Sequence, residues 1–168
     1  MKLSVGKVAF PIEFDNGDKD VIYFNPNDPD LATRLMKAKD SIGDRLEALN
    51  ADDYNLKNDG SFEMPTDIDG YEDLPDEQRE ALNERAEVMT KLIGSTKKII
   101  CEEIDSAFNG DISHVVFKHC SPLAVVNGEY FVVQFLNGIT PEIQKKINKS
   151  NAEVEKKMSK HIAKYQKR

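Results

Sequence analysis

The side chains of this chain that could most readily take part in catalysis or metal binding are those of two histidines and a neighbouring cysteine, His114, His119 and Cys120. An imidazole next to a thiol is the combination that a zinc site or a cysteine nucleophile requires. A spacing of five does not bring two imidazoles to one face of a helix as a spacing of four does, and Cys101 is the only other cysteine. We therefore expect neither a metal site nor a nucleophile, and two reduced thiols instead.

Carboxylates are concentrated in residues 51–75, which also hold several glycines and prolines and show no sustained periodicity. A calcium-binding EF-hand loop needs an oxygen ligand at positions 1 and 3 and glycine at position 6. Placing Gly70 at position 6 puts Pro65 at position 1, and placing Gly60 there puts Lys57 at position 3. The pattern favours a solvated acidic loop, and a regulatory or binding role for this loop is an alternative function. The sequence contains no phosphate-binding glycine motif either, and with no nucleophile, metal set or phosphate loop we expect no enzymatic activity and no cofactor.

Charge is distributed unevenly along the 168 residues, whose formal net charge is −7. Residues 50–80 carry 11 acidic and 2 basic side chains, whereas residues 140–168 carry 9 basic and 3 acidic ones. This asymmetry is compatible with self-association, with a charged partner, or with two solvated segments that never meet. Because the chain is acidic overall and contains no recognisable nucleic-acid-binding motif, we expect no nucleic-acid partner.

The first part of the chain predicts a β-hairpin followed by a helix. Apolar residues alternate with polar ones in residues 1–24, with a turn at Asn16-Gly17. Residues 28–50 then repeat leucines and isoleucines at helical spacing, with Asp28 as the expected N-cap and Pro29 in the first turn. We expect the acidic loop to begin at residue 51.

Residues 76–120 predict the central helices. Their apolar stripe runs from Leu82 to Phe108, which is long for a small domain, so this helix either breaks near residues 94–96 or projects as one arm of a dimer. Asn109-Gly110 is a helix stop signal, and Asp111 is the expected cap of a short following helix.

Residues 121–168 join the most apolar stretch of the chain to a lysine-rich helix. The stretch around Asn127-Gly128 fits either a hairpin or a short buried helix that contains Phe131 and Phe135. Thr140 is the expected cap of the C-terminal helix, with Pro141 as its first residue. The sequence thus predicts a single domain over residues 1–168, mainly α with a small N-terminal β-hairpin, in which amphipathic helices surround one core.

No apolar run approaches the roughly 18 residues that span a bilayer, and the N-terminus does not resemble a secretory signal, so we expect no membrane association and a cytoplasmic location.

The order of these parts resembles a known family. The hairpin leads through Phe24-Asn25-Pro26-Asn27-Asp28-Pro29 into a helix, and Ser121-Pro122-Leu123 precedes Phe131-Val132-Val133-Gln134-Phe135-Leu136 and a lysine-rich end. This is similar to the tail assembly chaperone-like proteins of long-tailed bacteriophages with non-contractile tails, over residues 1–49 and 76–168. The resemblance implies a helix at residues 129–136 and a non-enzymatic role in the cytoplasm of the bacterial host. It also implies the tape measure protein as partner, the tail tube protein as a second one, and no catalytic residues.

A chaperone needs apolar surface for its client, and the densest aromatic segment is the natural place to expect it. We therefore expect partner contacts at Tyr130, Phe131, Phe135, Ile139 and Ile143, with the alternative that these residues form the core. A structural virion component, such as a tail or connector subunit, is a second alternative function. Possible self-association follows from the long helices and the charge asymmetry.

Overall fold

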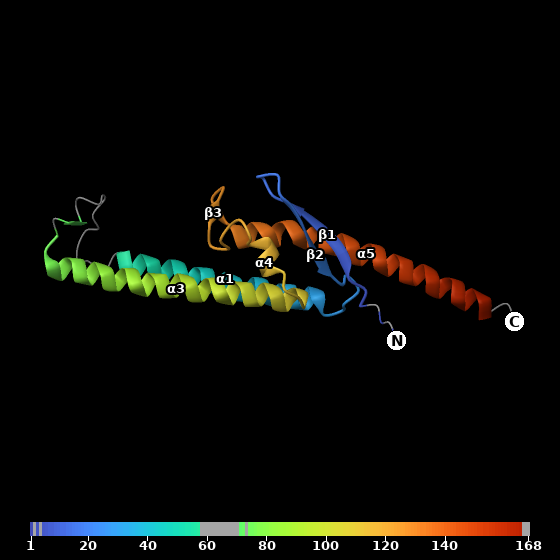
Figure 1. Ribbon diagram of the computed structural model, residues 1–168. Helices are drawn as coiled ribbons and strands as arrows, with labels where there is room; N and C mark the ends of the chain where they lie inside the picture. The colour runs from blue at the N-terminus through green and yellow to red at the C-terminus, as the bar shows by residue number, and fades with distance from the viewer. Residues whose placement is uncertain (2, 4, 58–70, 73, 166–168) are drawn as a thin grey trace.

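The computed structural model describes residues 1–165 except 2, 4, 58–70 and 73. Its elements in chain order are β1 (Val8–Glu13), β2 (Lys19–Phe24), α1 (Leu31–Lys57), α3 (Asp76–Phe108), α4 (Ser113–Val116), β3 (Val125–Val126), β4 (Glu129–Tyr130) and α5 (Phe131–Tyr165). The expected fold class, mainly α with a small N-terminal hairpin and a long C-terminal helix, is confirmed. Helices α1 and α3 lie side by side as a long hairpin, and α5 extends away from the opposite end of the molecule (Figure 1). None of the described helices is long and apolar enough to cross a membrane.

Strands β1 and β2 form an antiparallel pair in which Val8 is opposite Phe24. Gly17 in the connecting turn has a φ of +87°, a conformation that glycine adopts without strain. Side chains on one face of β1 are half-buried against the core, while Ile22 and Phe24 of β2 are fully buried. The hairpin is therefore stabilised by packing, because an isolated two-stranded hairpin is marginal in water.

Asp28 organises the start of α1, although the regular helix begins three residues later, at Leu31. Its carboxylate accepts a hydrogen bond from the Asp30 N–H at 3.0 Å and an ion-paired one from Arg34 at 2.7 Å. Arg34 also donates from Nε to the carbonyl oxygen of Ala107 at the end of α3, at 3.0 Å. These contacts lower the pKa of Asp28 below its ordinary value of 3.8, chiefly through the Arg34 hydrogen bond.

Two expected boundaries along α1 and α3 differ from the structure. Helix α1 continues to Lys57, so the first part of the expected acidic loop at residues 51–75 is helical; residues 58–70 and 73 of that loop lie outside the described residues. Helix α3 runs without interruption through residues 94–96, and Thr96 within it is buried. The Gly-Ser-Thr sequence does not break the helix because α1 packs alongside it.

The cap of α4 is Asp105, and the expectation that Asp111 caps it was wrong. Asp105 Oδ1 accepts hydrogen bonds from the N–H groups of Ile112 and Ser113, both at 2.7 Å, and its Oδ2 accepts one from the Ser113 hydroxyl at 2.9 Å. Asn109 ends α3 in the left-handed conformation, with a φ of 52°, and turns the chain back towards Asp105. A cap from the preceding helix replaces a local one.

The apolar stretch contains both alternatives, a hairpin followed by a helix. Asn127 and Gly128 both have positive φ, 54° and 83°, which is typical of a two-residue turn between β3 and β4. Helix α5 then begins at Phe131 and includes Pro141 in its interior, so the expectation that Thr140 caps a separate helix was wrong. The Thr140 hydroxyl instead donates to the Leu136 carbonyl oxygen within the same helix.

The core lies where β2, the first half of α1, the second half of α3, α4 and the first half of α5 meet. Its buried members include Ile22, Phe24, Leu31, Leu35, Ile42, Ile100, Ile104, Phe108, Val116, Val132, Leu136, Ile139 and Ile143. A series of aromatic rings in contact joins the hairpin to the helices. The ring centroids are 6.1 Å apart for Phe10 and Phe24, 5.9 Å for Phe24 and Phe108, and 6.2 Å for Phe108 and Phe135. These four rings connect β1, β2, α3 and α5.

Candidate functional site

The structure separates the two histidines that the sequence places close together. The Nδ1 atom of His114 lies 3.0 Å from the Asp111 carboxylate on the exposed surface. His119 instead faces the β1–β2 turn, with its Nε2 2.9 Å from Asp18 Oδ2 and its ring edge-on to Phe14 at 4.9 Å between centroids. Among the described residues no group of three or more histidines, cysteines or carboxylates is arranged to hold a metal ion.

The two cysteines are free thiols in different surroundings. Burial raises the pKa of the Cys101 thiol, and a hydrogen bond with Ser113 offsets part of that effect. A raised pKa keeps Cys101 in the unreactive thiol form at neutral pH. Cys120, which is half-buried like Cys101, lies in the wall of a groove.

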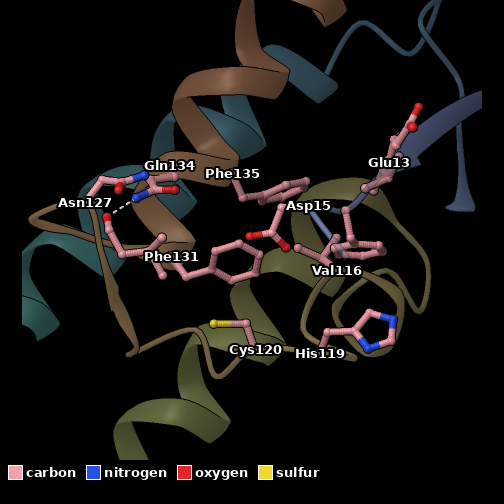
Figure 2. Close-up of a pocket in the computed structure, with 12 residues that line it drawn as sticks. Glu13, Asp15, Val116, His119, Cys120, Asn127, Phe131, Gln134 and Phe135 are labelled. Atoms are coloured by element: carbon pink, nitrogen blue, oxygen red, sulfur yellow. Dashed lines mark hydrogen bonds between the residues drawn. The ribbon is translucent and has the colours of Figure 1, made fainter. Parts of the chain in front are cut away.

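That groove, which we call the aromatic groove, has a volume of about 560 Å³. It lies between the end of β1, the segment after α4, the β3–β4 turn and the first turns of α5. Its lining residues are Ile12, Glu13, Phe14, Asp15, Val116, His119, Cys120, Val126, Asn127, Phe131, Gln134 and Phe135. Figure 2 shows the Phe131 and Phe135 side chains extending from α5 into this space, with Cys120 and His119 along its edge.

Helical spacing places the two aromatic side chains of the groove together. Phe131 and Phe135 are four residues apart and therefore share one face of α5. Phe117 packs against both rings, with its ring centroid 6.2 Å from that of Phe131 and 6.4 Å from that of Phe135. The Gln134 amide donates to the Val126 carbonyl oxygen and so ties the β3–β4 hairpin to the same helix.

The polar lining residues of the aromatic groove include two carboxylates as well as His119, Asn127 and Gln134. The carboxylates belong to Glu13 and Asp15, which are exposed and come from the end of β1 and the turn after it. The groove therefore combines aromatic rings with negative charge, and Figure 2 shows the Asp15 carboxylate between Phe131 and Phe135. Such a surface suits an apolar segment of another protein that carries basic residues alongside.

The structure divides the five residues that were expected to contact a partner. Phe131 and Phe135 are half-buried and line the aromatic groove. Tyr130 lines a second groove, and its hydroxyl donates to Asn50 Oδ1 at 2.6 Å. Ile139 and Ile143 are only 3% and 2% exposed, so these two residues are part of the hydrophobic core, which was the alternative expectation.

The second groove has a volume of about 420 Å³ and lies between the α1–α3 hairpin and the β3–β4 hairpin. Its lining is largely apolar and comprises Leu49, Asn50, Met89, Ile93, Ser121, Leu123, Ala124, Val125 and Tyr130. Val125 is 65% exposed and Ile93 is 43% exposed, so two large apolar side chains of this groove face solvent.

Several groove residues were missed from the sequence because they come from distant parts of the chain. Ile12 and Phe14 belong to the β1 end, more than 100 residues before Phe131. One signal was available: Phe14 continues the alternating apolar pattern of β1 past the end of the strand, on the same face as Phe10 and Ile12. Only the packing of the hairpin near α4 and α5 shows where that ring goes.

Comparison of the chain with protein-family models, with curated proteins and with solved structures found no match in any of the three.

Proposed function

We propose that this protein is a non-enzymatic chaperone of phage tail assembly, which binds the tape measure protein in the cytoplasm of the bacterial host. The observation that supports the proposal is the aromatic groove, a hollow of about 560 Å³ whose lining includes the side chains of Phe14, Phe131 and Phe135. Aromatic side chains gathered in a surface hollow are typical of protein-binding surfaces. The partner's identity rests on the family resemblance of the sequence.

The chemistry of the groove defines the client segment. An amphipathic helix would place two or three apolar side chains, spaced by three and four residues, on the aromatic floor. Lysines or arginines beside that apolar edge would lie near Glu13 and Asp15. By covering the apolar edge, the chaperone keeps a long apolar client from aggregating, and recruitment of the tail tube protein follows as a later step.

The test is co-expression of the full chain with successive segments of the tape measure protein, followed by pull-down. We expect one segment to co-purify with the wild type. The Phe131→Ala, Phe135→Ala variant should retain at most about a tenth of that yield, since aromatic anchors at the centre of an interface each contribute upwards of 1 kcal/mol.

The matched control is Tyr23→Ala, which removes an aromatic side chain that is 54% exposed on β2 and outside the groove lining. This variant should co-purify like the wild type. Unchanged co-purification by a folded Phe131→Ala, Phe135→Ala variant, with wild-type circular dichroism, would contradict the site. Mass spectrometry of purified phage particles addresses the function: a chaperone leaves the particle, whereas a structural virion component stays in it.

A further inference from the structure

Two helices continue beyond the core with their apolar stripes uncovered. In α3 the stripe is buried at Ile100 and Ile104, but Met89 is only half-buried and Ile93 is 43% exposed. In α5 it is buried at Ile139 and Ile143. Further along α5, Val154, Met158 and Ile162 are 50%, 59% and 53% exposed. Apolar side chains repeated at helical spacing on a solvent-exposed face indicate a missing neighbour.

These two surfaces match in length, and each includes large apolar side chains that are exposed. The first, which we call the distal hairpin, consists of residues 44–57 of α1 and 76–93 of α3; Met89 and Ile93 in it line the second groove beside Val125. The second, the α5 tail, consists of residues 148–165. Both the tail and the α3 part of the distal hairpin are 18 residues long, about 27 Å of helix. A single helix laid against a helical pair completes a three-helix arrangement, in which an apolar edge enters an apolar groove.

Their charges are complementary as well. Among the residues whose side chains the structure describes, the distal hairpin carries seven acidic and four basic side chains, whereas the α5 tail carries three lysines and two glutamates. Within one chain the two surfaces cannot meet, because they extend from opposite ends of the core (Figure 1). The surface that fits the α5 tail in both apolar pattern and charge is therefore on another molecule of the same chain.

We propose that two copies form an antiparallel dimer in which the α5 tail of each copy packs along the distal hairpin of the other. A two-fold axis across the long dimension places one copy's tail beside its partner's hairpin, and the same rotation places the partner's tail beside the first copy's hairpin. The contact is thus made twice, and the assembly is closed. The aromatic groove belongs to neither surface, so this dimer is independent of client binding.

The test is sedimentation velocity of the full chain over a range of concentrations at low ionic strength. We expect a species with twice the mass of one chain that dissociates as salt is raised, because exposed charge pairs are screened. The Met158→Glu, Ile162→Glu variant should weaken dimerisation by about ten-thousandfold, since each substitution removes an apolar contact of roughly tenfold value and the symmetric dimer makes each contact twice. Both residues are exposed, so the fold should be unchanged by circular dichroism.

The matched control is Met36→Glu, which puts the same charge on a methionine of α1 that is 68% exposed and outside both surfaces; it should dimerise like the wild type. Reversing charge on the tail with Lys156→Glu and Lys157→Glu should weaken the dimer, and adding Glu80→Lys and Glu84→Lys to the same chain should restore it. A monomeric wild type, an undisturbed dimer of Met158→Glu, Ile162→Glu, or growth into open-ended chains would each overturn the proposal.

Discussion

The two halves of α5 carry the same kind of apolar stripe and have opposite environments. In the first half Leu136, Ile139 and Ile143 are no more than 3% exposed, whereas in the second half Met158 is 59% exposed. The helical period defines which face of a helix is apolar, but other elements decide whether that face is covered. The first half has β2, α3 and α4 around it, while the second half extends past all of them (Figure 1).

The same contrast exists within α3. Its second half is part of the core, and its first half, from Asp76 to Ser95, contains no fully buried residue. Both helices therefore have one end that stabilises the fold and one end whose apolar side chains are exposed. If the proposed dimer forms through the exposed ends, stability and self-association depend on different stretches of the same helices and are separable by mutation.

The largest expected effect contrasts one core residue with one tail residue of α5. Leu136→Ala leaves a cavity at a residue that is 2% exposed and should lower the free energy of unfolding by about 2–5 kcal/mol. Met158→Ala should change it by less than about 0.5 kcal/mol. Urea denaturation at low protein concentration measures both, and similar losses for the two variants would refute the division of α5.

A smaller effect is expected at the junction between α3 and α4. Asp105→Ala removes an acceptor of three hydrogen bonds and leaves the N–H groups of Ile112 and Ser113 without it, at a cost of about 2 kcal/mol. Asp111→Ala is the control, because its carboxylate contacts only the exposed His114 among the interactions described here; it should cost less than about 0.5 kcal/mol. A larger loss for Asp111→Ala in thermal unfolding would restore the local-cap interpretation.

Pro141→Ala tests whether the covered and uncovered halves of α5 belong to one helix. Within a continuous helix, proline is about 3 kcal/mol less favourable than alanine, and greater freedom of the unfolded chain offsets part of that gain. We therefore expect the variant to be more stable by about 2 kcal/mol in urea denaturation. A neutral or destabilising result would mean that Pro141 begins a separate helix.

The smallest expected effect is on the pH dependence of stability, through Asp28 at the start of α1. Because the folded-state pKa of Asp28 lies below 3.8, its contribution to stability is present above that pH and is lost as the pH falls through the folded-state value. The wild type should lose up to about 1 kcal/mol more than Asp28→Asn between pH 5 and pH 2.5. Parallel curves for the two proteins in pH-dependent thermal unfolding would exclude a role for the Asp28–Arg34 pair.

The sequence predicted the elements whose signals are local. The alternation of β1 and β2, the Asn16-Gly17 turn and the apolar stripes of α1 and α3 all depend on neighbours within a few residues, and the mainly-α fold class follows from them. Local signals misled where a distant group was stronger: Asp105, not Asp111, caps α4, and packing against the core keeps α5 helical through Pro141.

The candidate site was predicted only in part, for the same reason. Phe131 and Phe135 were identified from the density of aromatic side chains, but the adjoining helix stripe was included as well, and it contains Ile139 and Ile143, which are buried. Helical periodicity identifies the apolar face of a helix, but it cannot distinguish the buried residues of that face from the exposed ones. The contributions of Ile12, Phe14 and Cys120 depend on how the end of β1 and the segment after α4 pack beside α5, which no spacing in the sequence reveals.

The ring series from Phe10 through Phe24 and Phe108 to Phe135 has a consequence for the synthesis of this protein on the ribosome. Phe108 meets its last ring partner only when α5 has emerged, more than 20 residues later. Until then, Phe24 and Phe108 of the nascent chain are not covered by Val132 and Leu136. Translation pauses or truncations before residue 131 should therefore yield chains that aggregate, since the core is closed last.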